Sequence, residues 1–263
     1  MAKKVRKYIF SKGIDETFKG IYDAIAFMGL FFKQAFKGPY HFRQIIDQCY
    51  EVGLKSLPLI TLTGFVTGVV FTKQSRPSLE VFGATSWLPS LISIALVRAL
   101  GSLVTALICA GKVGSSIGAE LGSMKVTEQI DAMEVSAINP FKYLVVTRVT
   151  ATTLMVPILS FYCSCVGLLG AFVNVHANET TSFANFFQSG FGDIGFIDIF
   201  SSVAKAIVFG FTIGIVGCYK GFNASQGTRG VGKAANQAVV TTMFLIFIEE
   251  IVIVQISNWI RFF

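Results

Sequence analysis

Four charged residues stand inside long apolar runs of this sequence: Arg98, Lys205, Glu249 and Glu250. A charge at the centre of a membrane helix costs about 2.5–3.5 kcal/mol on insertion scales, so such residues face a partner or a polar cavity and avoid lipid. The opposite signs allow two uses. The residues could form buried ion pairs that fix helix register, or a polar patch in a substrate cavity where a cation meets an anionic group.

Two other segments resemble catalytic motifs but lack what the chemistry needs. Residues 114–118 match G-x-S-x-G, but a nucleophile elbow needs a preceding strand and a histidine on the same side of the membrane. Residues 227–234 approach a nucleotide-binding loop, but Ala234 replaces the Ser or Thr that would ligate magnesium. We therefore predict no catalytic residue, no metal site and no ATPase in this chain, and take 227–234 as a turn that opens the last helix.

The composition is that of a membrane protein. Of 263 residues, 53% are hydrophobic and only 14% charged, whereas soluble domains carry about 25% charged residues. The mean hydropathy is +0.65. We predict an all-α integral membrane protein with one domain over residues 1–263, in which residues 1–45 are cytoplasmic and interfacial and residues 46–263 form the membrane core.

Five apolar runs approach or exceed the roughly 20 residues that cross a bilayer. They lie near residues 52–71, 87–110, 148–175, 197–218 and 238–257. The net charge of +7 is concentrated before the first run, at Lys3, Lys4, Arg6, Lys7, Lys12, Lys19, Lys33, Lys37 and Arg43. The positive-inside rule then predicts a cytoplasmic N-terminus, five crossings place the C-terminus on the opposite side of the membrane, and this distribution argues against nucleic-acid binding.

On this topology the intramembrane charges of opposite sign lie at similar depths. With a rise of ~1.5 Å per residue, Arg98 lies roughly 17 Å from the outer end of its span, Lys205 roughly 12 Å and Glu250 roughly 11 Å. We therefore expect Lys205 or Arg98 to pair with Glu249 or Glu250. The glycine pairs Gly64/Gly68 and Gly210/Gly214 have the spacing of close helix contacts, which we expect mostly within the chain.

Residues 15–37 predict an amphipathic helix that is too short in its apolar core to span. Its apolar residues recur at helical spacing: Phe18, Ile21, Tyr22, Ile25, Met28, Phe32 and Phe36. We expect this helix to lie in the cytoplasmic interface. Packing on the protein's own core is the alternative.

A polar segment, residues 111–140, separates the second and third runs and predicts a short cytoplasmic helix. Thr127 would be its N-cap, and Asn139-Pro140 its end. The helix would carry an apolar stripe and an acidic stripe: Ile130, Met133, Ala137; and Glu128, Asp131, Glu134. Two such faces suit docking into a partner's groove, although a helix lying on the membrane surface remains the alternative.

Residues 110–149, AGKVGSSIGAELGSMKVTEQIDAMEVSAINPFKYLVVTRV, closely resemble the signature region of the MlaE/YrbE permease family. The resemblance extends to residues 96–98, 205–209, 227–232 and 238–240. It implies an interfacial helix followed by five spanning helices, with a coupling helix between the second and third spans. It also implies a non-catalytic permease subunit that moves phospholipids between the inner and outer membranes of a bacterium.

The resemblance also implies partners and site residues. The expected partners are a second copy of the chain, a cytosolic ABC ATPase dimer that binds ATP and magnesium, and a periplasmic MCE-domain protein. The chain itself would bind no cofactor. The residues implied for coupling to the ATPase are Thr127, Glu128, Gln129, Asp131, Met133 and Glu134, and those implied for the lipid path are Arg98, Lys205, Glu249 and Glu250.

Two departures from the family pattern concern charge. The family often has an acid after the arginine of the second span, where this chain has Ala99, and it usually has one acid in the last span, where this chain has two. We therefore predict that the extra glutamate compensates the charge of Arg98. A scaffold that anchors a periplasmic complex, a permease for another hydrophobic cargo such as a sterol, and a lipid-modifying membrane enzyme remain alternatives.

Overall fold

The computed structural model describes residues 9–38, 41–178 and 181–262, and within them it contains helices and no strand. Two units are distinguished, residues 1–40 and residues 41–263. The first unit contains one helix, α1 (Ile9–Ala35), in agreement with the predicted N-terminal helix. Phe18, Tyr22 and Ile25 of its predicted apolar stripe are exposed. Lys3, Lys4, Arg6 and Lys7, which entered the topology prediction, lie outside the described residues.

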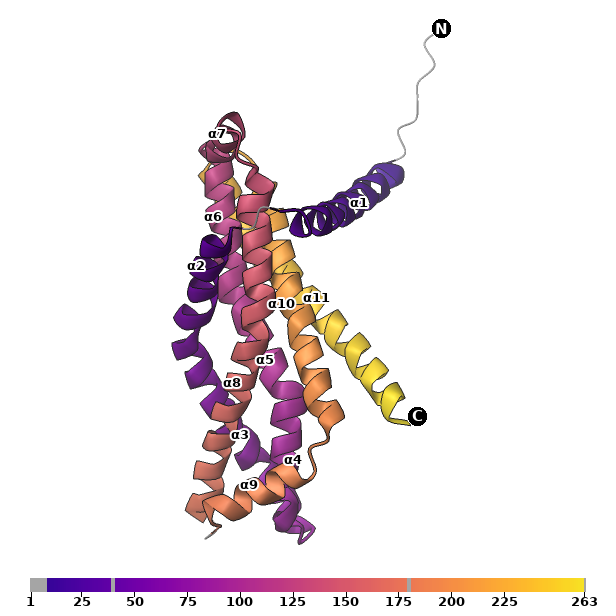
Figure 1. Cartoon of the computed structure of the whole chain (residues 1–263). Coiled ribbons are helices and arrows are strands. Elements are labelled where there is room, and N and C mark those ends of the chain that lie inside the picture. The colour runs from indigo at the N-terminus through magenta and orange to yellow at the C-terminus, as the bar shows by residue number, and fades with distance from the viewer. Residues whose placement is uncertain (1–8, 39–40, 179–180, 263) are drawn as a thin grey trace. The chain divides into compact units, whose positions relative to one another are not determined.

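The second unit is a helical bundle (Figure 1). Its helices, in chain order, are α2 (Phe42–Gly53), η1 (Leu54–Ser56), α3 (Leu57–Val81), η2 (Thr85–Trp87), α4 (Leu88–Ala95), η3 (Leu96–Leu100), α5 (Gly101–Cys109), η4 (Ala110–Gly114), α6 (Ser115–Val126), α7 (Gln129–Val135), η5 (Phe141–Val146), α8 (Thr147–Asn178), α9 (Phe183–Gly192), α10 (Phe196–Phe222) and α11 (Thr228–Phe262). Segments η3, η4 and η5 are π-helical.

Five helical runs among the described residues are long and apolar enough to cross a membrane, as predicted. They are Phe42–Val81, Thr85–Val126, Phe141–Ala177, Phe196–Phe222 and Thr228–Trp259. All five are longer than the sequence suggested, because helix continues beyond the apolar core. Short helices stand at the two ends of the bundle, with α7 at one end and α9 at the other (Figure 1). We call these the α7 end and the α9 end.

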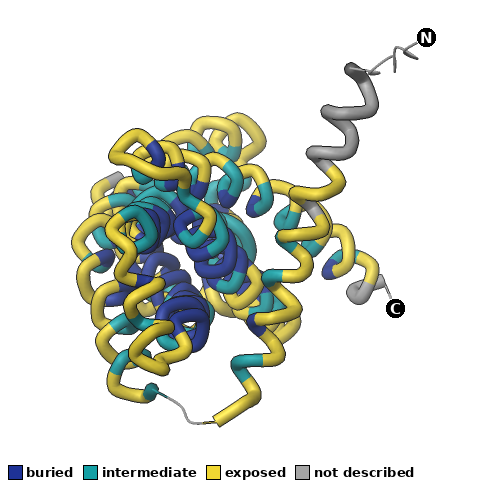
Figure 2. Tube along the Cα trace, turned by 90° about the horizontal axis from the view of Figure 1, so that it is seen from above, coloured by how far each residue is buried: buried dark blue, intermediate teal, exposed yellow. Residues whose placement is uncertain are grey.

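The third run is central and the fifth peripheral. In its most apolar stretch, 56% of the residues of the third run are buried, against 11% for the fifth. Seen along the bundle, buried residues (dark blue) gather in the middle and exposed ones (yellow) surround them (Figure 2). A chain that crosses a bilayer needs no polar exterior there, because its outward side chains meet lipid.

The predicted glycine pairs pack within the chain, as expected. A Cβ on Gly68 would lie 1.9 Å from the carbonyl oxygen of Gly167 on α8, and one on Gly210 would lie 2.5 Å from that of Thr152 on the same helix. Only glycine permits such close backbone approach. Gly118 and Gly122 have a similar role, which the sequence did not indicate. A Cβ on Gly118 would lie 3.2 Å from the Cα of Ala235 on α11, and both glycines belong to helix α6, which continues the second run.

Helix α9 was not predicted. Ser182 caps its N-terminus by accepting a hydrogen bond from the backbone N–H of Asn185 at 3.3 Å. Its buried Phe186 joins a core with Leu88, Ile92 and Leu168. Aromatic residues therefore fold this connection onto the α9 ends of α4 and α8.

Candidate functional site

Polar residues on α10 recur every seven residues: Asp198, Lys205 and Thr212. Seven residues make almost two helical turns, so all three lie on one face of the helix. All three are buried. We call these residues, together with Arg98, Glu249, Glu250 and Asn258, the polar ladder.

Lys205 forms the central contact of the polar ladder. Its ammonium nitrogen lies 2.8 Å from Oε1 of Glu250 on α11, and its side chain is only 2% exposed. This confirms the predicted pairing of Lys205 with an acid of the last span. Two turns further along α10, the Thr212 hydroxyl donates a hydrogen bond to Glu249 Oε1 at 2.6 Å. Each carboxylate has a second buried oxygen, Oε2, with no hydrogen-bond partner among the described residues.

Arg98 lies at the other end of the ladder, in the π-helical segment η3. Its Nη2 donates to Oδ1 of Asn258 on α11 at 2.5 Å, and its Nε lies 3.8 Å from Oδ1 of Asp198. Asp198 also accepts a hydrogen bond from the backbone N–H of Gly195 at 3.2 Å, which caps α10. One guanidinium thereby joins η3, α10 and α11.

The prediction that an extra glutamate compensates Arg98 is therefore wrong. Asn258 lies eight residues beyond Glu250, a rise of ~12 Å along α11. Arg98 lies at the level of Asn258, whereas Glu250 lies at the level of Lys205. Asp198 takes the compensating role, and neither Asp198 nor Asn258 was identified from the sequence. The seven-residue step from Asp198 to Lys205 was the available signal.

A second charged contact was also missed. Arg148, near the start of α8, has a side chain only 2% exposed, and its Nη2 donates to Oε1 of Glu120 on α6 at 2.7 Å. Its Nη1 donates to the carbonyl oxygen of Leu144 at 3.1 Å. A buried guanidinium needs a partner, which Glu120 supplies.

Helix α7 occupies the position of the predicted coupling helix but begins later. Thr127 is not its N-cap, because its hydroxyl donates back to the carbonyl oxygen of Ser123 at 2.9 Å and ends α6. Glu128 precedes α7 instead, in the left-handed region at φ 59°. The helix ends at Val135, so Ala137 lies outside it.

The two faces predicted for α7 are only partly present. Ile130 is buried and Met133 half-buried, which ties the helix to the bundle. Glu128, Asp131 and Glu134 are exposed as predicted. Val135, which the prediction did not include, is also exposed. The outward surface of α7 is therefore acidic, with one large apolar side chain.

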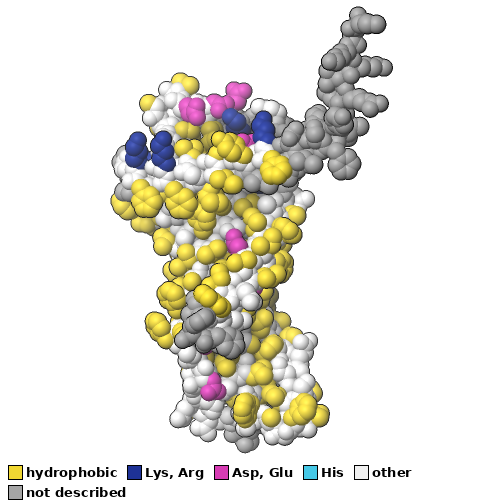
Figure 3. All heavy atoms as spheres, turned by 90° about the vertical axis from the view of Figure 1, so that its right-hand side faces the viewer, with side chains coloured by type: hydrophobic (Ala, Val, Ile, Leu, Met, Phe, Trp, Pro, Cys, Tyr) yellow, Lys and Arg dark blue, Asp and Glu magenta, His cyan; other side chains and the backbone are white. Residues whose placement is uncertain are grey.

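Hydrophobic side chains surround the few charges on one face of the bundle (Figure 3). Hydrophobic side chains (yellow) cover much of the face shown in Figure 3, with acidic side chains (magenta) standing singly below the α7 end. Among the described residues, no three His, Cys, Asp or Glu side chains are grouped closely enough to hold a metal ion. The polar ladder therefore holds its ion pairs and hydrogen bonds among apolar residues.

The comparisons with known proteins agree with these features. The family model described as Permease MlaE matches residues 45–256. A probable ABC transporter permease protein of Rickettsia typhi is 35% identical over 238 residues, which cover 90% of this chain and 91% of the relative. One of Synechocystis sp. is 35% identical over 248 residues, covering 93% and 92%.

A plant protein is also similar. The chloroplastic protein trigalactosyldiacylglycerol 1 of Arabidopsis thaliana is 32% identical over 217 residues, which cover 82% of this chain and 62% of the plant protein. The family match spans most of the chain and includes the polar ladder up to Glu250, together with α7. The chain is a multi-pass membrane protein that belongs to the MlaE family of ABC transporter permeases.

Proposed function

We propose that this chain is the non-catalytic permease subunit of an ABC transporter that moves phospholipids. It works as a homodimer, and a separate cytosolic ATPase dimer binds ATP and magnesium. Family membership supports the transporter class. The name of the Arabidopsis relative contains a glycerolipid, trigalactosyldiacylglycerol, which supports a lipid cargo.

The polar ladder carries the proposal. A phospholipid that crosses this protein brings a charged headgroup into an apolar region, where cations are costly unless they are paired. Lys205 and Arg98 are cations with protein partners, and a phosphate could exchange with those partners. The buried Oε2 atoms of Glu249 and Glu250 have no hydrogen-bond partner among the described residues, and a donor group of a lipid headgroup, such as a hydroxyl or an ammonium, could satisfy them.

An apolar cavity at the α9 end supports an amphiphilic cargo. It has a volume of about 1140 Å³ and is lined by side chains of α3, η2, α4 and α9, among them Phe71, Trp87, Leu91 and Ile94. Acyl chains gain free energy in such surroundings, at roughly 0.8 kcal/mol per buried CH₂. A sterol would also fit an apolar cavity, but it carries no anionic group that could exchange with the protein partners of Lys205 and Arg98.

The exposed surface of α7 supports energy coupling. Its acidic residues and Val135 project from the end of the bundle, where a groove on an ATPase could hold them. We place this end in the cytoplasm of a bacterium and the α9 end in the periplasm, beside an MCE-domain protein. The transporter lies in the inner membrane and exchanges phospholipid with the outer membrane.

Affinity purification in mild detergent with mass spectrometry of the partners tests this proposal. An ABC ATPase and an MCE-domain protein should be recovered in fixed ratio with this chain. Recovery of the chain without an ATPase, even after crosslinking at α7, would contradict the proposal. A scaffold would tolerate neutralising Arg98 and Lys205 together, whereas a lipid path would not.

A further inference from the structure

Helix α2 has two dissimilar faces. Phe42, Ile46 and Tyr50 follow one another at four-residue spacing, and all three are exposed. Each of the polar residues Asp47 and Glu51 directly follows a residue of this stripe, so the two are also four residues apart. Lys55 lies four residues further on, in η1. The apolar stripe suits contact with lipid, and the polar side lines a cavity.

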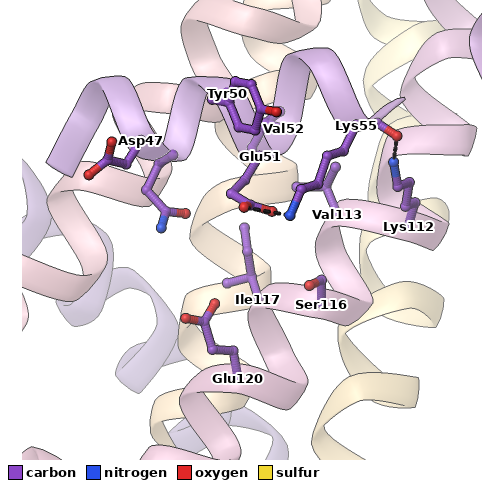
Figure 4. Close-up of a pocket in the computed structure, with 11 residues that line it drawn as sticks. Asp47, Tyr50, Glu51, Val52, Lys55, Lys112, Val113, Ser116, Ile117 and Glu120 are labelled. Atoms are coloured by element: carbon purple, nitrogen blue, oxygen red, sulfur yellow. Dashed lines mark hydrogen bonds and ion pairs between the residues drawn. The ribbon is translucent and has the colours of Figure 1, made fainter. Parts of the chain in front are cut away.

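This cavity has a volume of about 800 Å³ and lies between α2 and η1 on one side and η4 and α6 on the other (Figure 4). We call it the α2–α6 cavity. Ligand-binding cavities commonly have volumes of about 300–1,000 Å³. Its charged lining residues are Asp47, Glu51, Lys55, Lys112 and Glu120. None of them belongs to the polar ladder or to α7.

The charges of the α2–α6 cavity are separated by sign. In Figure 4 the carboxylates of Asp47 and Glu120 lie on one side, and the amines of Lys55 and Lys112 lie toward the other. Glu51 lies between the acidic side and the basic side, and its carboxylate accepts a hydrogen bond from Lys55 Nζ at 2.6 Å. Lys112 donates to the backbone carbonyl oxygen of Lys55, so the Lys112 ammonium lies beside the residue whose own ammonium contacts Glu51.

The carboxylate of Glu120 is held in place by a buried arginine. Its Oε1 accepts from Nη2 of Arg148 at 2.7 Å, and the Arg148 side chain is buried. The Glu120 side chain itself remains 52% exposed toward the cavity. The acidic side of the cavity is therefore preorganised by a residue that does not line it.

The helical run Phe42–Val81 places this cavity near a membrane surface. Its 40 residues span about 60 Å, twice the roughly 30 Å thickness of the hydrocarbon core. Residues 56–72 contain no charged residue, so they suit the hydrocarbon. The residues from Asp47 to Lys55 then lie at the level of the lipid headgroups, next to an apolar stripe.

We propose that the α2–α6 cavity binds the zwitterionic headgroup of an aminophospholipid. Asp47 and Glu120 receive the ammonium group, and Lys55 and Lys112 receive the phosphate. The acyl chains leave along the apolar stripe of α2 into the adjoining leaflet. This inference rests on the proposed function, since it takes a phospholipid as cargo, and it identifies the headgroup class that is selected before the polar ladder is reached.

Photocrosslinking of the full chain in nanodiscs tests the inference. Ser116 is exposed and lines the cavity, so a photoreactive amino acid at this position reports the lipid there. The nanodiscs contain phosphatidylethanolamine and phosphatidylglycerol in equal amounts, and the adducts are identified by mass spectrometry. The ethanolamine lipid should exceed the glycerol lipid by roughly threefold to tenfold, as expected for one or two exposed charge contacts.

Substitutions assign the two ends of the headgroup. Asp47→Asn should abolish the preference for the ethanolamine lipid, and Asp47→Glu, which keeps the carboxylate, should retain it. Lys55→Gln should reduce the adducts of both lipids. The matched controls Glu80→Gln and Lys73→Gln alter exposed residues near the other end of the same helical run and should change neither. Each variant is first checked for a single symmetric peak in size-exclusion chromatography.

Equal labelling by the two lipids, or a preference that survives Asp47→Asn, would overturn the headgroup assignment. Adducts with a protein segment in place of lipid would assign the cavity to that segment and would also overturn it. If these results appear while ATP-driven phospholipid transport persists, only the cavity assignment fails. If neither adducts nor transport are found, the proposed function fails with it.

Discussion

Lys205 on α10 and Glu250 on α11 form an ion pair at 2.8 Å, with both side chains largely withdrawn from the surface. The pair lies midway along the polar ladder, between the Arg98 contacts and the Thr212–Glu249 hydrogen bond. A buried pair of this kind adds little net stability, because desolvation offsets the attraction, but loss of one partner leaves a buried charge. Removal of one partner should therefore lower stability more than removal of both.

The Lys205–Glu250 pair should be sensitive to the loss of one partner. Lys205→Met should destabilise the protein by about 3–5 kcal/mol, because it leaves Glu250 without its cation. The double variant Lys205→Met with Glu250→Met should recover most of that loss. Thermal unfolding in detergent, followed by tryptophan fluorescence, measures the difference. Additive losses in the double variant would show that the pair is not formed.

The two glutamates of the last span should respond differently. Glu249→Gln keeps an acceptor for the Thr212 hydroxyl, whereas Glu250→Gln removes the charge that faces Lys205. We expect a near-neutral change in melting temperature for Glu249→Gln and a clear decrease for Glu250→Gln. A larger decrease for Glu249→Gln would contradict the observed partners.

Helix contact at Gly68 should be intolerant of a methyl group. A Cβ there would lie 1.9 Å from the carbonyl oxygen of Gly167, so α3 and α8 would have to separate. Gly68→Ala should cost about 1–3 kcal/mol, as other overpacked substitutions do. Gly232→Ala on α11 is the control, since among the described residues no atom beyond its own stretch of helix lies within 4 Å of its Cβ position. Equal melting temperatures for the two variants would argue against the close packing.

The exposed acids of α7 should affect coupling and leave folding intact. Glu128→Lys combined with Glu134→Lys alters only exposed side chains, so the melting temperature should change little. The rate of ATP hydrolysis by the assembled transporter should no longer respond to lipid. Simultaneous measurement of phosphate release and lipid movement checks this. Unchanged coupling would remove α7 from the proposed mechanism.

The number of spans could be predicted, as could the pairing of an intramembrane cation with an acid of the last span, because hydropathy and intramembrane charge are local properties of the sequence. The partners of Arg98 could not, because they depend on how η3, α10 and α11 are rotated against one another. Asp198 and Asn258 lie near the ends of apolar runs. Polar residues there cost less free energy of membrane insertion, so their presence is a weaker sign of a buried partner. Arg148 was overlooked for the same reason.

The start of α7 was mispredicted for a different reason. Thr127 has the residue type of an N-cap, but its hydroxyl bonds within α6. The chain turns at Glu128 with a positive φ, a conformation that this residue type rarely adopts. Local propensity gave way here to the packing of Ile130, which is buried against the bundle.

The most direct test of the proposed function is ATP-driven lipid movement by the reconstituted complex. The chain and its ATPase are placed in proteoliposomes with fluorescent phospholipid, and movement is followed on addition of ATP. The wild type should move phospholipid only with ATP, and Arg98→Gln with Lys205→Gln should greatly reduce movement per assembled complex, counted after size-exclusion chromatography because loss of Lys205 also destabilises the fold. Undiminished movement in this double variant, or none in the wild type with an active ATPase, would contradict a phospholipid path along the polar ladder.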